Sequence, residues 1–250
     1  MPLNNRGFDI IRLADASAEV CDSFVDLPAD PYCPDRCRRF SQYRVSHRVG
    51  RWGMEVLPHR PLIQPERFNS YVGGVLRYLE PMKIDVSYYV ATVAEQVLLD
   101  PEMDWHFDVH QWRTACHAEA DSISVPEGPH QDGHEFGAIV IVSRQNVVGG
   151  LTTLYSLTDR SPFFETTLGP SEALIFDDRR MLHFTSNVRA SGRDGYRDIF
   201  VFNINSWYSR KYGSDSVTGL PRRNSSWTRR RSIWPTSFPQ CRRGWRRCGY

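Results

Sequence analysis

The sequence has no long apolar run. No stretch approaches the roughly 18 consecutive apolar residues that a membrane-spanning helix needs. The first residues also lack the basic and then apolar pattern of a secretory signal. We therefore expect a cytoplasmic protein that does not enter the membrane. Hydrophobic residues make up 40% and aromatic residues 12% of the 250 residues, which excludes wholesale disorder.

Acidic residues are absent after Asp215, where nine arginines and no lysine follow. Residues 1–215 carry the other 22 basic side chains against 29 acidic ones, a net charge of −7. Residues 216–250 show no helical or strand period, so we expect a basic, disordered tail. A basic arm that binds nucleic acid is the alternative, but the acidic body disfavours nucleic acid as a partner.

Cysteine is scarce, with six residues in the whole chain. The pair Cys33-x3-Cys37 suggests zinc, but no second close pair of Cys or His completes a site at the usual spacing. A chain of this size without a secretory signal more often keeps its cysteines reduced. We therefore expect reduced cysteines and no structural zinc.

The apolar pattern changes near residue 105. Before it, helical spacing predicts helices over 67–79 and 86–99, and a strand-like stretch covers 43–49. After it, short runs of branched and aromatic residues are separated by turn residues, which predicts a β-sandwich or barrel. The predicted strands of this second part are 106–114, 136–142, 151–156, 163–168, 173–176, 181–185 and 197–204.

The predicted organisation is mainly β with flanking helices. Residues 1–104 form an N-terminal helical and loop region that packs on the core. Residues 105–215 form the β core, which carries the chemistry, and residues 216–250 form the tail. Because the helices precede the strands, we expect them to cover one face of the core.

The densest chemistry lies in the segment Pro126–His134. His130 and Asp132 are two residues apart, and on an extended strand this spacing puts both side chains on one face. An imidazole and a carboxylate from one strand, joined by a second imidazole, form the two-histidine, one-carboxylate set of non-haem iron(II) oxygenases. That set leaves three coordination positions open for other ligands. The spacing therefore predicts a metal site.

The second imidazole must come from elsewhere in the chain. His183 follows the apolar run 173–176 and a turn, so it could face back toward His130 and Asp132. His134 could share their strand face and is the rival ligand. We favour His183 because a distant strand supplies the third ligand in such sites.

Arg197 opens the predicted strand 197–204, after His183 in the chain. A buried guanidinium can form a two-pronged salt bridge with a carboxylate. Arg197 could hold the far carboxylate of 2-oxoglutarate, whose keto acid end chelates iron. The alternative is that Arg197 pairs with Asp194 or Asp198 on the surface.

These residues and their neighbours resemble the 2-oxoglutarate/Fe(II)-dependent dioxygenases that act on free amino acids, typified by isoleucine dioxygenase. The resemblance covers roughly residues 105–205. The similar segments are 110–113, 126–133, 144–150, 178–183 and 197–198.

The resemblance implies a double-stranded β-helix (jelly-roll, cupin-like) core, with Fe(II), 2-oxoglutarate and O₂ as cofactors and co-substrates. It implies that His130, Asp132 and His183 are the catalytic iron ligands and that Arg197 anchors 2-oxoglutarate. Two further candidates for cofactor binding are Arg113 and Asn146, although Asn146 could instead cap a bend. Glu127 and Arg144 also lie in similar segments, without an assigned contact.

The implied reaction is hydroxylation of an aliphatic C–H bond of a free L-amino acid or similar small molecule, with release of succinate and CO₂. The same enzyme class can also desaturate a substrate or close a ring, such as an aziridine. A catalytically inactive metal-binding β-barrel is the alternative from another class. The expected partner is a small-molecule substrate, and a homodimer is a possible assembly.

Overall fold

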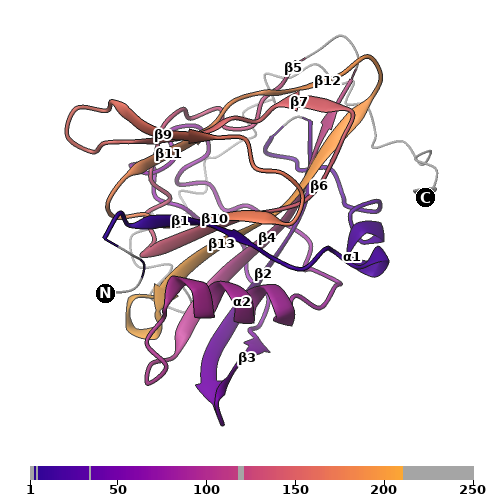
Figure 1. Cartoon of the computed structure of the whole chain (residues 1–250). Helices are drawn as coiled ribbons and strands as arrows, with labels where there is room; N and C mark the ends of the chain where they lie inside the picture. Colours follow the sequence, from indigo (N-terminus) through magenta and orange to yellow (C-terminus); the bar gives the residue numbers. More distant parts are fainter. Residues whose placement is uncertain (1–2, 4, 34, 118–120, 211–250) are drawn as a thin grey trace, which may run out of the picture.

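A computed structural model of the chain describes residues 3, 5–33, 35–117 and 121–210. The predicted basic tail, 216–250, lies outside the described residues. The described part is mainly β, as predicted, with a double-stranded β-helix core (Figure 1). Among the described residues, no helix is both long and apolar enough to cross a membrane.

A seven-stranded sheet forms the larger layer, in the order β1-β10-β6-β13-β4-β2-β3, and each neighbouring pair is antiparallel. Three of its strands come from the first 104 residues. The division at residue 105 therefore stays a prediction, and strands from both sides of it pair in one sheet. The seven strands are β1 (Phe8–Arg12), β2 (Arg36–Arg48), β3 (Arg51–Val56), β4 (Trp105–Cys116), β6 (Phe136–Gln145), β10 (Glu172–Asp177) and β13 (Gly195–Ser206).

Two three-stranded sheets complete the β structure, in the orders β11-β8-β9 and β5-β12-β7. The first of these sheets carries His183 on β11, so this candidate ligand comes from outside the large sheet. The strands of the two small sheets are β8 (Thr152–Tyr155), β9 (Pro162–Thr166), β11 (Leu182–Thr185), β5 (Asp121–Ser122), β7 (Val147–Gly149) and β12 (Val188–Ala190). Every strand predicted from the sequence is present, and five further strands, β1, β3, β5, β7 and β12, were not predicted.

The helices lie at the outer face of the large sheet (Figure 1). The helix α2 (Ser87–Val97) confirms the prediction over 86–99, and Leu98 ends it in the left-handed conformation. A short helix, α1 (Ala18–Asp22), begins at Ser17, whose hydroxyl accepts a hydrogen bond from the N–H of Val20. A 3₁₀ turn, η1 (Trp207–Ser209), follows β13.

The helix predicted over residues 67–79 is absent, and turns take its place. The Asn69 carboxamide oxygen accepts hydrogen bonds from the N–H groups two and three residues later, which competes with helical bonding. Gly74 has φ +73°, outside the helical region. Beyond it the chain extends, and Leu62 and Arg77 exchange backbone hydrogen bonds. The helical spacing was therefore a misleading signal here.

Strand alternation on β13 separates the core from the cavity. Phe200 and Phe202 face the helices, where they join the apolar cluster that contains Val90 and Val93 of α2. Residues that alternate with them along the strand point to the opposite face, and that face lines a cavity inside the jelly roll. The cavity-lining residues of β13 are Arg197, Ile199, Val201 and Asn203.

Cysteine chemistry departs from the expectation at one position. Cys33 is a buried free thiol, as expected. Cys37, buried in β2, is disulfide-bonded, so the expectation of reduced cysteines is wrong for this residue. Neither cysteine belongs to a cluster of potential metal ligands among the described residues.

Candidate metal centre and cofactor pocket

His130 and His183 face each other across a two-residue antiparallel bridge. The His130 N–H donates to the His183 carbonyl at 3.1 Å, and the His183 N–H donates to the His130 carbonyl at 2.9 Å. The two imidazole rings lie 4.5 Å apart between centroids. This bridge joins two distant segments of the chain, so it brings the two predicted imidazoles together.

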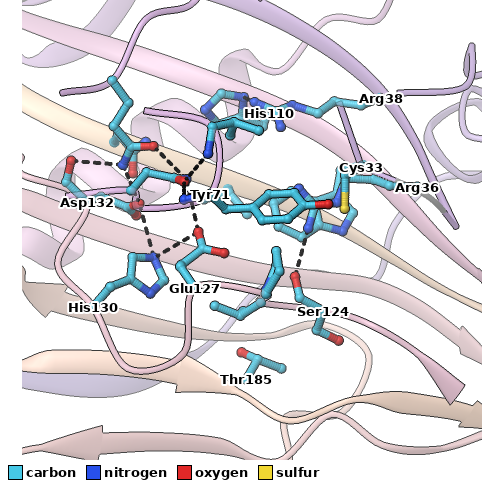
Figure 2. A pocket seen from close by; sticks show the side chains of 18 of the residues that line it. Cys33, Arg36, Arg38, Tyr71, His110, Ser124, Glu127, His130, Asp132 and Thr185 are labelled. Carbon is cyan, nitrogen blue, oxygen red and sulfur yellow. Dashed lines mark hydrogen bonds and ion pairs between the residues drawn. The ribbon is translucent and has the colours of Figure 1, made fainter. Parts of the chain in front are cut away.

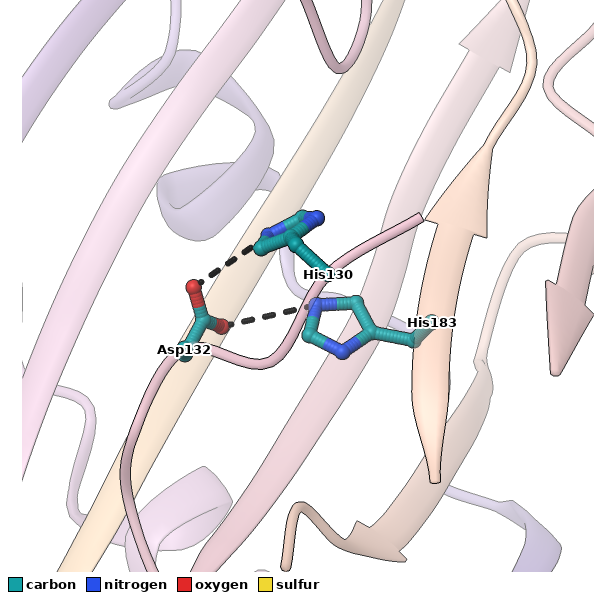
Figure 3. Close-up of side chains that lie close together, drawn as sticks. All are labelled: His130, Asp132 and His183. Carbon is teal, nitrogen blue, oxygen red and sulfur yellow. Dashed lines mark ion pairs between the residues drawn. The ribbon is translucent and has the colours of Figure 1, made fainter. Parts of the chain in front are cut away.

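Asp132 lies between the two imidazoles (Figure 3). Its Oδ1 is 3.5 Å from Nε2 of His130, and its Oδ2 is 3.5 Å from Nε2 of His183. The three predicted residues each offer a ligand atom within 4.8 Å of the others. Metal–ligand bonds are about 2.0–2.2 Å long, so donor atoms about 3–4 Å apart can meet at one ion. The three residues therefore fit a metal site with one open side.

The local backbone differs from the one predicted. Only His130 is paired, in an isolated bridge, and residues 131–134 form a loop rather than a continuous strand. Gly133 in this loop has φ +80°, and a Cβ there would meet the ring of Phe68 at 2.3 Å. Asp132 therefore reaches the site through a loop geometry that the strand model did not include.

Asp178 organises this loop, and the sequence placed it in the similar segment 178–183 without assigning it a role. Its carboxylate is 1% exposed and accepts hydrogen bonds from the N–H groups of Asp132 at 3.1 Å, Gly133 at 2.8 Å and His134 at 3.0 Å. It also lies 3.5 Å from Nδ1 of His183. The signal available in the sequence was its position directly after the apolar strand that precedes His183.

Burial and the neighbouring charges act in opposite directions on the groups of this cluster. Burial by itself would raise the pKa of Asp132, but hydrogen bonds and charges from His130 and His183 hold that pKa well below its usual range. Burial opposes the charge on His183, yet Asp132 and Asp178 raise the pKa of His183 to about 10. A histidine must be neutral to bind a metal, so a proton and a metal ion compete for this imidazole.

His134, the rival ligand, occupies a different place. Its ring is buried, and Nδ1 lies 2.8 Å from the Asn205 carboxamide nitrogen. The ring lines the cavity but does not belong to the cluster of potential metal ligands found among the described residues. The structure thus groups His183, rather than His134, with His130 and Asp132.

The cluster opens into a cavity of about 110 Å³ (Figure 2). A cavity needs about 10–15 Å³ to hold one water molecule, so a cavity of this volume has room for small organic ligands. One wall is apolar and includes Ile139, Phe176 and Ile199. Another region is rich in arginine and acidic side chains.

Arg197 enters this cavity from β13. It is 2% exposed, its Nε and NH2 atoms have no hydrogen-bond partner, and its side chain forms no ion pair with any described residue. The alternative pairing with Asp194 or Asp198 is therefore absent in the described part of the chain. Burial, and then the charge of Arg144, lower the pKa of Arg197 to about 9. A buried cation of this kind needs an anion, and a carboxylate of 2-oxoglutarate fits that need.

Two other predicted cofactor residues are not brought to the cavity. Arg113 forms a buried two-pronged ion pair with Asp198, with Nε–Oδ1 at 2.6 Å and NH2–Oδ2 at 2.7 Å. Asn146 has φ 50° at the bend between β6 and β7, and its side chain donates to the Asp194 carbonyl at 3.3 Å. Neither residue lines the cavity. The cap alternative for Asn146 agrees with this position.

The two residues without an assigned contact are also located. Glu127 lines the cavity, with Oε1 3.7 Å from Nε2 of His130 (Figure 2). Arg144 donates through NH2 to the Gly149 carbonyl at 2.7 Å, and it lies close enough to Arg197 to depress the pKa of Arg197. Arg144 therefore adds positive charge beside the proposed 2-oxoglutarate anchor.

Comparison with solved structures shows the same fold in several proteins. A bsmA homolog from Methylobium petroleophilum PM1 has 23% identity and a TM-score of 0.65, with 76% of this chain and 80% of that chain covered. IDO from Bacillus thuringiensis has 16% identity and a TM-score of 0.61, with 81% and 91% covered. The Fe(II)/(alpha)ketoglutarate-dependent dioxygenase TqaL has 13% identity and a TM-score of 0.55, with 80% and 82% covered.

A search of the curated proteins finds no match. A family model, described as 2OG-Fe dioxygenase, matches residues 21–203, which is more than half of the chain and includes every residue of the candidate site. This family uses Fe(II), 2-oxoglutarate and O₂, and the cluster of His130, Asp132 and His183 fits the metal. The chain belongs to the 2OG-Fe dioxygenase family.

Proposed function

We propose that this dioxygenase hydroxylates an aliphatic C–H bond of a free L-amino acid or a similar small molecule, with release of succinate and CO₂. One observation carries the proposal: the three potential metal ligands and the unpaired guanidinium of Arg197 line one cavity. The choice of an amino acid rests on the resemblance of segments 110–113, 126–133 and 144–150 to dioxygenases that act on such substrates.

In this proposal His130, Asp132 and His183 hold Fe(II), and Arg197 holds the far carboxylate of 2-oxoglutarate. When bound, these groups supply the oxidation of the substrate by O₂. The chain supplies position and shelter. Asp178 keeps the ligand loop in place through three backbone hydrogen bonds. The apolar side chains of Ile139, Phe176 and Ile199 exclude water from one wall.

Two alternatives remain open beside hydroxylation. The same residues could direct desaturation or ring closure, because the outcome depends on how the substrate is held. A metal-binding module without activity is the alternative from another class. The complete ligand cluster together with Arg197 favours the enzyme, since an inactive member is expected to lose one of these groups. A cytoplasmic location and a homodimer stay predictions.

The test is a screen of the twenty L-amino acids for substrate-dependent succinate formation, with Fe(II), 2-oxoglutarate and O₂ present. At least one amino acid should raise succinate formation well above the rate without substrate, and mass spectrometry of that amino acid should show one added oxygen. Loss of two hydrogens would instead indicate desaturation or ring closure. Binding of 2-oxoglutarate without succinate from any amino acid would contradict the proposed substrate class.

A further inference from the structure

Arg77 is a buried cation without a counter-ion in the described part of the chain. It is 5% exposed and lines the cavity. Its side chain makes one long hydrogen bond, from NH2 to Oε1 of Gln64 at 3.4 Å, and its Nε has no partner. No carboxylate among the described residues lies within 4.0 Å of it. A buried charge without a partner is costly, so such a group implies an anion that the protein itself does not supply.

Arg77 is one of three arginines in this part of the cavity, together with Arg36 and Arg38. Arg38 is buried beside it, and its partners are Asp30 at 3.4 Å and Nδ1 of His110 at 3.2 Å. Arg36 stacks on Trp112, with its guanidinium carbon 3.7 Å from the ring centroid. The acidic groups that line this region are Asp30, Glu127 and Asp132, and Asp132 is one of the proposed metal ligands. With Asp132 assigned to the metal, three guanidiniums face two carboxylates, which leaves one positive charge for a ligand.

The pKa values agree with mutual repulsion in this region. Burial lowers the pKa of Arg77, the charge of Asp30 and, less strongly, those of Glu127 and Asp132 oppose the shift, and the charge of Arg36 adds to it. Burial lowers the pKa of Arg38 to about 9; the charge of Asp30 opposes this shift, and the charges of Arg77 and Arg36 add to it. An anion bound among these side chains would relieve that repulsion.

This region is separate from Arg197. Arg36 and Arg38 belong to β2, and Arg197 belongs to β13, with β4 between the two strands. Neighbouring strands lie about 4.8 Å apart, so the two backbones are roughly 10 Å apart. One anion held by Arg197 therefore leaves Arg77 and its neighbours available for a second anion.

Arg77 is also linked to the metal ligands through one side chain. Gln64 accepts from Arg77 through Oε1, and its Nε2 lies 3.2 Å from both the carbonyl and Oδ1 of Asp132. Asn69 supports the same carboxamide, with Nδ2 3.2 Å from Gln64 Oε1. A small molecule bound at Arg77 is therefore separated from the proposed metal ligand Asp132 by one side chain, that of Gln64.

From these contacts we propose that Arg77 binds a carboxylate of the substrate and thereby selects small molecules that carry a carboxylate. This inference rests on the proposed function, because it assigns a residue of the same cavity to the substrate. It assigns Arg197 and Arg77 to two different carboxylates, one on the co-substrate and one on the substrate.

The test compares the most active amino acid of the screen with its primary amide, in the wild type, Arg77→Gln and Arg77→Lys. A site built for a charged group rejects an analogue that lacks it. The wild type should lose about 100-fold or more in kcat/KM on the amide. Arg77→Gln should lose about as much on the amino acid but little on the amide, and Arg77→Lys should recover part of the loss. Arg51→Gln, on the exposed end of β3, is the matched control.

Two results would overturn the assignment. Equal losses of Arg77→Gln on the amino acid and on its amide would show that Arg77 does not read the carboxylate. A raised KM for 2-oxoglutarate in Arg77→Gln, with an unchanged one in Arg197→Gln, would place the co-substrate at Arg77. Misfolding is not expected, because the substitution removes an unpaired buried charge; ligand-free Arg77→Gln should melt at or above the wild-type temperature.

A binding measurement tests the subsite even if no amino acid is turned over. Propionate should raise the melting temperature of the anaerobic protein saturated with Fe(II) and 2-oxoglutarate, and propionamide should not, because only a ligand of the folded state stabilises it. The shift should disappear in Arg77→Gln. An equal shift in both proteins, or none in the wild type, would contradict an anion subsite at Arg77, whatever the screen shows.

Discussion

Oδ1 of Asp178 lies 3.5 Å from Nδ1 of His183, while Oδ2 of Asp132 lies 3.5 Å from Nε2 of the same ring. The imidazole is therefore held between two carboxylates, one of them a proposed metal ligand. A carboxylate behind a histidine ligand fixes the orientation of the ring and raises its basicity. Asp178 also holds the loop that carries Asp132, so it positions two of the three proposed ligands.

Asp178→Asn should weaken Fe(II) binding about 10–100-fold, as loss of such a supporting carboxylate usually does. An anaerobic Fe(II) titration in the presence of 2-oxoglutarate measures this through the visible charge-transfer band. Asp177→Asn is the matched control, because Asp177 pairs with Arg179 and not with the ligand loop. Equal weakening in both variants would show that Asp178 has no particular role.

His183→Ala should abolish succinate formation, because it removes one of the three proposed ligands. His134→Gln should retain Fe(II) binding, since His134 contacts Asn205 and lies outside the ligand cluster. The same anaerobic titration and a succinate assay measure both effects. The ligand assignment is wrong if His183→Ala still forms succinate, or if His134→Gln is the variant that no longer binds the metal.

Arg197→Gln should raise the KM for 2-oxoglutarate by about 30-fold or more, because loss of a buried charged partner costs about 2–5 kcal/mol and 1.4 kcal/mol corresponds to tenfold. Fe(II) affinity should change little, since Arg197 does not contact the metal ligands. Separate titrations of Fe(II) and 2-oxoglutarate distinguish the two effects. Equal losses of Fe(II) affinity and 2-oxoglutarate affinity would contradict the role of Arg197 as the 2-oxoglutarate anchor.

Asp198→Asn should lower the free energy of unfolding by about 3–5 kcal/mol, because it leaves the buried Arg113 guanidinium without its carboxylate. Burial raises the pKa of Asp198, and Arg113 opposes this shift. Each charge of the buried pair therefore depends on the other. Urea unfolding measures the effect, with Glu55→Gln on the exposed part of β3 as the control. A change below about 1 kcal/mol would show that the pair contributes little.

Asp104 should make stability depend on acid pH. Burial opposes its charge, but the hydrogen bonds and charges from Arg44 and Arg48 together outweigh burial and lower the pKa of Asp104 below the ordinary value of 3.8. Its contribution to stability is therefore present above that value and is lost as pH falls through the lower folded-state pKa. The difference in unfolding free energy between wild type and Asp104→Asn should be larger at neutral pH than near pH 3, as urea titrations at both pH values would show. A difference that grows toward acid pH would reverse this sign.

The strands were predictable because burial on alternating positions leaves a local record. The runs around residues 136–142 and 197–204 appear as β6 and β13 with boundaries shifted by a few residues. The helical spacing over 67–79 failed because the carboxamide of Asn69 and the conformation of Gly74 turn the chain. Periodicity reports which positions are apolar; it does not report side-chain hydrogen bonds to the backbone.

The sequence by itself determined which residue types could form the site. The spacing of His130 and Asp132, and the order in which His183 and Arg197 follow, already predicted a metal site with a carboxylate anchor. These features are local or depend only on order along the chain.

Only the tertiary structure decided which groups have partners. Arg113 and Arg197 are both buried arginines on adjacent strands, yet Asp198 neutralises Arg113 and no described residue neutralises Arg197. Likewise, a backbone bridge brings His130 and His183 together, and His134 lies outside the ligand cluster. A partner is fixed by strand register and by the loop held on Asp178, which join distant segments, so no local pattern could reveal it.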